Sequence, residues 1–229
     1  FQGHGKLVVK GSPDHKIGKI DILRNRIHRV NFRPRPPSPG LNIPAIAVDD
    51  GTRIHIAGNI ITRSWGVGIW ITGGKQNNAD IRDRPLIRNY IHHNSVIDSL
   101  LVVNDWGAFA MWQGGPQYAW GNVAGNPVGP HPHIKDEKDS ANKKAQSYFR
   151  GYGHNGYAYY LDGSYKQYVF NNIAWGKANN PSECFRNRSS QMMVLGFLNQ
   201  WFNNTFNRFM IGASGSSGTH SSALANIYA

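Results

Sequence analysis

Three residues with useful side chains share one position of a recurring pattern. Trp65, Trp106 and His154 each lie nine residues before a glycine that closes a turn. Asp105 lies one position before Trp106, so it falls close to His154 if the repeating segments stack in register. Aspartate and histidine can transfer protons at a glycosidic oxygen. The spacing therefore predicts a sugar-cleaving site. Tryptophan faces would pack on sugar C–H faces, and Asp105 and His154 would transfer protons.

A recurring asparagine indicates which elements position these residues. The asparagines are Asn25, Asn59, Asn89, Asn122, Asn172, Asn204 and Asn226, and an apolar or β-branched residue usually follows within two positions. Successive steps are 34, 30, 33, 50, 32 and 22 residues. A short basic step with a variable excess is typical of stacked coils with loop insertions. We interpret these asparagines as structural, because an inward asparagine at a turn can bind its neighbours above and below and satisfy buried backbone groups.

Short apolar runs that end in glycine turns form the second part of the repeat. They lie at 45–51, 68–74, 110–115 and 158–163, and further β-like runs at 53–56, 86–87, 118–120 and 168–170 lead on to the asparagines. Gly and Asp-Gly allow the positive φ of tight turns. Because every repeat makes the same moves in the same order, equivalent strands should stack in parallel at roughly 4.8 Å. The predicted fold class is an all-β solenoid of about seven coils.

Composition supports a β-rich chain and restricts the partners. Of 229 residues, 17% are charged and 12% aromatic, and the net charge of +12 attracts polyanions in general. We expect neither nucleic acid nor membrane as a partner, because the sequence has no recognised nucleic-acid-binding motif and no transmembrane stretch. Cys184 is the single cysteine, so there is no disulfide framework and no thiolate zinc site.

The expected organisation is one domain over residues 5–229. Residues 1–4 resemble the remnant of an expression tag, and the proline-rich and charged stretch 126–150 is expected to be a long loop that overhangs the predicted site. The repeat pattern runs to both ends without caps. We therefore expect a chain truncated at one or both ends, or an oligomer formed through open coil ends.

The asparagine-turn repeats resemble the right-handed parallel β-helix proteins of the pectate-lyase-like superfamily over essentially the whole chain. The segments 104–107, 112–115 and 159–163 look like parts of bacterial β-helix proteins grouped with carbohydrate-active enzymes. The resemblance implies a right-handed parallel β-helix, a polysaccharide substrate, and secretion or a periplasmic location. It implies cleavage either by hydrolysis or by β-elimination, and it does not choose between them.

Hydrolysis is slightly favoured as the predicted reaction, with Asp105 and Asp162 as acid/base or nucleophile and His154 in support. A hydrolase generally needs two carboxylates roughly 5 to 9.5 Å apart. Asp105 and Asp162 are expected on adjacent coils but at opposite ends of one strand, and Asp50 and Asp162 at one corner but three coils apart.

A lyase acting on an acidic, uronate-containing glycan is the first alternative. His154 or Tyr152 would be its base, and Arg150, Arg63 and Lys166 would neutralise the uronate. The second alternative is a non-catalytic glycan-binding solenoid. The predicted substrate-binding residues are Trp65, Trp106, Trp112, Tyr152, Tyr160 and Arg150.

No metal or cofactor is expected for the hydrolase. A lyase that uses Ca²⁺ would need a carboxylate cluster, which Asp49 and Asp50 alone hardly provide. His92 and His93 form one pair of potential metal ligands, and we interpret them as turn residues.

Overall fold

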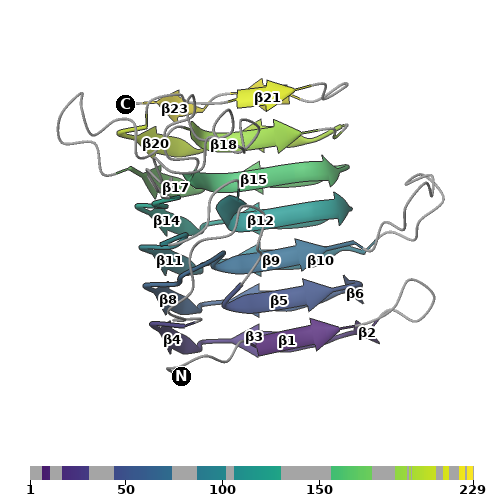
Figure 1. The fold of residues 1–229 in the computed structure, drawn as a ribbon. Helices are drawn as coiled ribbons and strands as arrows, with labels where there is room; N and C mark the ends of the chain where they lie inside the picture. Colours follow the sequence, from purple (N-terminus) through teal and green to yellow (C-terminus); the bar gives the residue numbers. More distant parts are fainter. Residues whose placement is uncertain are drawn as a thin grey trace, which may run out of the picture.

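Parallel sheets account for all the regular structure of the described chain. The computed structural model describes residues 7–10, 17–30, 44–73, 87–101, 106–129, 156–176, 189–194, 196, 198–209, 214–216, 222–224 and 226–228. Their strands form three seven-stranded sheets and one two-stranded sheet (Figure 1). Every strand pair in this part of the chain is parallel. The described residues contain no helix, and so none that could cross a membrane.

The first sheet contains the longest strands. It consists of β1 (Leu7–Lys10), β5 (Ile46–Asp49), β9 (Ile69–Thr72), β12 (Trp106–Gly114), β15 (Gly156–Ser164), β18 (Ser189–Val194) and β21 (Ser214–Ser216). The second consists of β3 (Asp21–Leu23), β7 (His55–Ala57), β10 (Asn89–His92), β13 (Gln117–Trp120), β16 (Gln167–Phe170), β19 (Gln200–Phe202) and β22 (Ser222–Leu224). The third consists of β4 (Arg26–His28), β8 (Ile60–Thr62), β11 (Ser95–Ile97), β14 (Val123–Gly125), β17 (Ile173–Trp175), β20 (Thr205–Asn207) and β23 (Ile227–Tyr228). The small sheet pairs β2 (Ile17–Gly18) with β6 (Gly51–Thr52).

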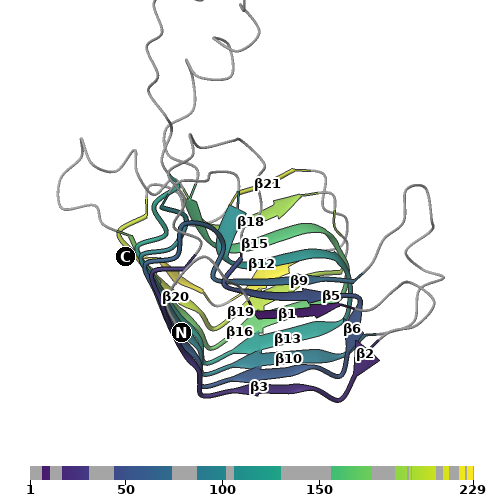
Figure 2. The same ribbon diagram turned by 60° about the horizontal axis from the view of Figure 1, so that its bottom comes forward.

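The chain visits the first, second and third sheets in turn. We call one such set of three strands, for example β12, β13 and β14, a tier. The tiers follow chain order from the N-terminal end of the stack to the C-terminal end (Figures 1 and 2). The expected all-β class and the parallel stacking of equivalent strands are confirmed. The third side of the tiers is a regular sheet, like the other two.

One hydrophobic core lies between the three sheets. In the third sheet the middle residue of each three-residue strand is buried, as the pattern exposed–buried–intermediate of β4 illustrates. Ile27, Ile61 and Val96 come from this sheet, and Ile56 and Ile71 from the other two, yet all belong to a single buried cluster. Because side chains alternate across a strand, the residues on either side of each core position face outward.

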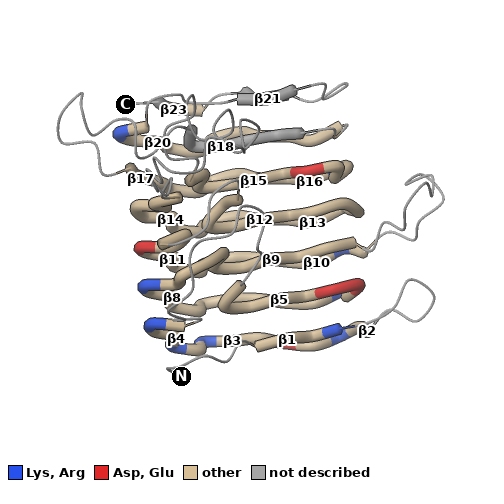
Figure 3. The backbone as a smooth tube through the Cα atoms, in the orientation of Figure 1, with Lys and Arg blue, Asp and Glu red and all other residues tan. Residues whose placement is uncertain are grey.

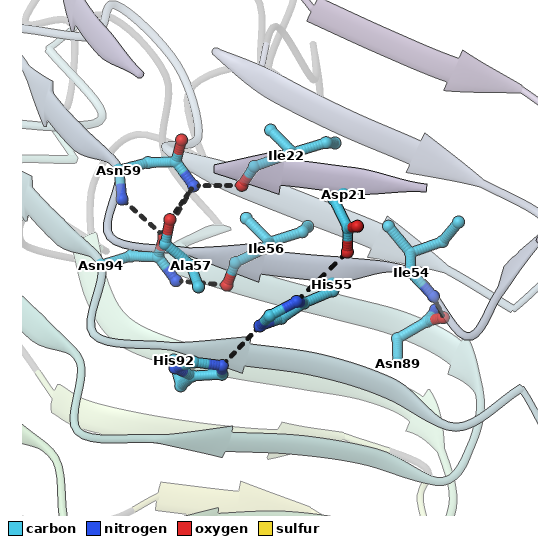
Figure 4. Close-up of polar contacts among 10 residues, drawn as sticks. All are labelled: Asp21, Ile22, Ile54, His55, Ile56, Ala57, Asn59, Asn89, His92 and Asn94. Atoms are coloured by element: carbon cyan, nitrogen blue, oxygen red, sulfur yellow. Dashed lines mark hydrogen bonds and ion pairs between the residues drawn. The ribbon is translucent and has the colours of Figure 1, made fainter. Parts of the chain in front are cut away.

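An asparagine ladder runs along the tier stack between the second and third sheets. Its members are Asn25, Asn59, Asn94, Asn122, Asn172, Asn204 and Asn226. Asn94 Oδ1 accepts the backbone N–H of Asn59 at 3.0 Å and its side-chain N–H at 2.9 Å. Asn94 Nδ2 donates to the carbonyl of Ile56 at 2.9 Å (Figure 4). The structural interpretation of these asparagines is therefore confirmed.

The assignment of Asn89 to this ladder is wrong. Asn94 holds that place, and Asn89 begins a separate polar column at the corner between the first and second sheets. There its Oδ1 accepts the Ile54 backbone N–H at 2.9 Å and its Nδ2 donates to the Gly51 carbonyl at 3.0 Å. Both asparagines follow a residue of positive φ, Arg88 at 50° and His93 at 54°, so their local settings are alike. Only the tier register separates them.

Many corner residues adopt a left-handed backbone. Each ladder asparagine from Asn25 to Asn204 is preceded by such a residue, for example Gly58 at 67° and Gly121 at 60°. Many of the residues with a left-handed backbone are cationic. The Lys and Arg residues with positive φ are Lys19, Arg24, Arg29, Arg53, Arg63, Arg88, Lys166 and Arg208. Most of these positive charges lie in the N-terminal tiers (Figure 3).

Candidate functional site

Five aromatic residues gather on the outer face of the first sheet. We call Trp70, Trp106, Trp112, Tyr157 and Tyr160 the outer aromatic cluster; they belong to a buried group distinct from the main core. Trp70 stacks on Trp106 with ring centroids 4.9 Å apart and meets Trp112 edge-on at 5.8 Å. Tyr160 contacts Trp106 at 5.7 Å and Tyr157 at 5.3 Å. The cluster has an accessible edge, because Trp106 and Trp112 are only partly buried.

Two indole groups of the cluster have unused hydrogen-bonding capacity. The Nε1 atoms of Trp70 and Trp106 are buried and have no hydrogen-bond partner among the residues that the structure describes. Trp70 as a whole is 9% exposed. Buried indole N–H groups usually find an acceptor. A ligand with hydroxyl or carboxylate oxygens would supply acceptors beside an apolar aromatic surface, a combination that suits a sugar.

The structure brings together some of the predicted binding residues. Trp106, Trp112 and Tyr160 lie in the cluster, and sequence reasoning missed Trp70 and Tyr157. Trp65 lies in the turn before β9, where its backbone N–H donates to the Val30 carbonyl at 3.2 Å. The predicted residues Asp105, Arg150, Tyr152 and His154 lie outside the described residues, as do residues 1–4 and most of the predicted loop 126–150.

The register expected from the closing glycines is wrong. Trp106 pairs with Gly156, two residues beyond His154. Phe109 pairs with Ile69, so the same register extended three residues before β9 places Gly66, rather than Trp65, level with Trp106. The error arose because the glycine turns do not all close at the same point of the tier, and the stacking partner of Trp106 is accordingly Trp70.

Asp162 is the predicted catalytic residue that the structure describes. It is partly buried near the end of β15 and pairs with Trp112. Through Thr72 this column continues to Asp49, three strands away, which is about 14 Å at the usual strand spacing. In the other direction along β15, Gly156, the partner of Trp106, is six residues or about 20 Å from Asp162. Neither separation matches the carboxylate pair of a hydrolase, so a second carboxylate would have to come from elsewhere.

A cluster of polar side chains, separate from the outer aromatic cluster, lies on the outer face of the second sheet (Figure 4). His55 Nδ1 lies 3.2 Å from Asp21 Oδ1, and His55 Nε2 lies 2.6 Å from His92 Nε2. His92 Nδ1 lies 2.8 Å from His93 Nδ1, and the His92 ring stacks on Trp120 at 4.3 Å. The four polar side chains form a chain of three contacts. Each contact can be a hydrogen bond with one shared proton while all three imidazoles stay neutral.

The surroundings of His92 favour its neutral form. Burial lowers the pKa of His92, and the neighbouring His55 and His93 lower it further. The geometry is linear rather than convergent. Within the described part of the chain, no three His, Cys, Asp or Glu side chains are grouped so that they could hold a metal ion.

Sequence reasoning missed this chain although a signal for it existed. Asp21 and His55 both lie four residues before a ladder asparagine, and His92 lies two residues before Asn94. Reading the ladder through Asn89 hid the position of His92 relative to Asn94.

Comparison with known proteins adds no constraint on the activity. No protein-family model, curated protein or solved structure matches this chain.

Proposed function

We propose that this chain is a right-handed parallel β-helix of about seven coils that binds a polysaccharide at the outer aromatic cluster and cleaves its glycosidic bonds. The observation that carries the proposal is the cluster itself, three tryptophans and two tyrosines on an outer sheet face with two unpartnered buried indole N–H groups. Aromatic side chains with a few polar groups are typical of ligand sites. The chain order of the three parallel sheets supports the β-helix, and it is compatible with the resemblance to the pectate-lyase-like superfamily.

Hydrolysis with Asp162 as the acid/base residue is the first candidate reaction. The carboxylate lies one register step from Trp112 and therefore beside the cluster. Asp105, adjacent in sequence to Trp106, is the predicted second group, and His154 the predicted supporting residue. Elimination from an acidic glycan is the second candidate. It is favoured by the distance of about 14 Å between the aligned carboxylates Asp49 and Asp162, because a lyase needs one base rather than a carboxylate pair.

An activity panel tests the proposal and separates the two reactions. The protein is incubated with neutral and acidic polysaccharides while new reducing ends and the ultraviolet absorbance of unsaturated products are followed. Reducing ends alone support hydrolysis, and reducing ends with absorbance support elimination. Asp162→Asn should lower hydrolysis by about 10²-fold or more if the carboxylate transfers protons.

Binding tests the role of the cluster independently of cleavage. Trp106→Phe keeps an aromatic ring and removes the N–H, so glycan affinity should fall several-fold. Trp175→Phe, at an exposed tryptophan of the third sheet, is the matched control and should bind as the parent does. Equal affinity of all three proteins would exclude the cluster as the binding site.

A further inference from the structure

A row of cations stands at the corner that leads into the second sheet. Lys19, Arg53 and Arg88 each lie two residues before a member of the register column that runs through β3, β7 and β10. They therefore follow one another along the tier stack, one per tier, and we call them the cationic ridge. All three are exposed, and within the described part of the chain none makes a side-chain hydrogen bond or ion pair.

The backbone conformation at these three positions does not favour long side chains, which indicates that the residues are there for their positive charge. The φ angles of Lys19, Arg53 and Arg88 are 58°, 55° and 50°, in the left-handed region. A long side chain is disfavoured there, and glycine or asparagine would fit more easily. The corner between the second and third sheets shows that alternative, since Gly58 and Gly121 fill it in two tiers. Local conformation therefore does not explain three successive long cations.

The sheet face beside the ridge adds titratable groups. Asp21, His55 and His92 project from β3, β7 and β10, and His93 follows at the next corner. The single carboxylate of this group is matched by His55 at 3.2 Å.

We propose that the cationic ridge and this face form a second binding site, separate from the outer aromatic cluster, for an acidic polysaccharide that runs along the tier stack. This proposal rests on the proposed function, because it takes the polymer to be a glycan. Strand spacing places successive ridge cations roughly 4.8 Å apart. Such a row suits a linear chain that carries one carboxylate or sulfate on each repeating unit.

The aromatic residues of this face disfavour single-stranded nucleic acid. Tyr90, Tyr118 and Tyr168 stack on one another, with centroids 5.6 and 5.1 Å apart and interplanar angles of 19° and 5°. Their ring faces are occupied by each other, so they present edges to solvent. Proteins that bind single strands generally use free aromatic faces as stacking platforms for bases.

Substitution of matched arginines tests the ridge. Arg53→Asn and Arg208→Asn remove the same charge from exposed corner residues with φ of 55° and 58°. Asparagine tolerates this conformation, so both variants should fold. Binding to immobilised polygalacturonate at low salt should weaken about fivefold for R53N and about twentyfold for R53N/R88N, and stay within about twofold for R208N. Neutral dextran should not bind to the ridge.

Two outcomes would overturn the ridge proposal. Equal losses for R53N and R208N would mean that only the diffuse net charge attracts the polymer. Tighter, ridge-dependent binding of a single-stranded DNA oligomer would identify a different ligand class. The Trp106→Phe variant separates the two sites, because it should weaken binding at the outer aromatic cluster and retain binding at the ridge. If no glycan is cleaved while ridge binding persists, the proposed function fails and the ridge stands.

Discussion

Truncation of a central ladder asparagine should destabilise the protein strongly. The Asn122 side chain makes four hydrogen bonds in a site that is 1% exposed. Its Nδ2 donates to the Ile91 carbonyl at 2.9 Å and to Asn172 Oδ1 at 3.1 Å. Its Oδ1 accepts the backbone and side-chain N–H groups of Asn94, both at 3.0 Å.

Asn122→Ala removes all four bonds and leaves buried groups of Asn94 and Ile91 without those partners. At about 1 kcal/mol per bond, with more for stranded groups, the free energy of unfolding should fall by about 4 kcal/mol or more. Asn25→Ala is the control at the end of the ladder. It loses bonds to the Leu23 carbonyl and to Asn59 Oδ1 in an exposed or partly buried setting, so its loss should be about 1 kcal/mol.

Urea unfolding followed by tryptophan fluorescence measures both losses. Asn122→Asp adds a check, because it keeps the acceptor for Asn94 but places a carboxylate oxygen against Asn172 Oδ1; it should be at least as damaging at neutral pH. A loss below about 2 kcal/mol for Asn122→Ala, or equal losses at Asn122 and Asn25, would refute the view that the ladder carries stability.

Three further predictions concern single positions. Gln117→Asn should raise stability by about 1 kcal/mol in the same urea assay, and a loss would contradict the reasoning. Within the described part of the chain both amide atoms of this fully buried side chain lack hydrogen-bond partners, whereas the shorter Asn89 in that column is paired. Because the pKa of His92 is lowered in the folded protein, the unfolded chain binds more protons just below about pH 6.5, and stability should fall on acidification. His92→Gln should make stability depend less on pH, and parallel pH profiles of the two proteins would disprove the coupling. Gly115→Ala should cost about 3 kcal/mol, because a Cβ there overlaps the Tyr165 carbonyl oxygen, and an unchanged melting temperature would show that the backbone yields.

The repeat was readable from the sequence because its cause is local. An asparagine after a left-handed corner residue, followed by outward, inward and outward side chains, recurs whatever the length of the connections. The same local cause produced the error at Asn89, since Arg88 and His93 adopt nearly the same φ. The pattern has no internal mark that separates a residue at one corner of a tier from its counterpart at another.

The candidate sites were less readable because they join residues from different tiers. Trp106 and Trp112 were identified as binding residues, but their contact with Trp70 depends on a register set by connections of unequal length. The three residues of the cationic ridge lie six residues before Asn25, Asn59 and Asn94, a spacing that becomes visible only with Asn94 in the ladder.

The sequence by itself determined the all-β class, the inward asparagines and the alternation of core and surface along each strand, because these follow from side-chain polarity and backbone conformation within a few residues. The tertiary structure alone decided which outward residues become neighbours across tiers. His55 meets His92, and Trp70 meets Trp106, because parallel pairing aligns segments whose offsets along the chain differ from tier to tier.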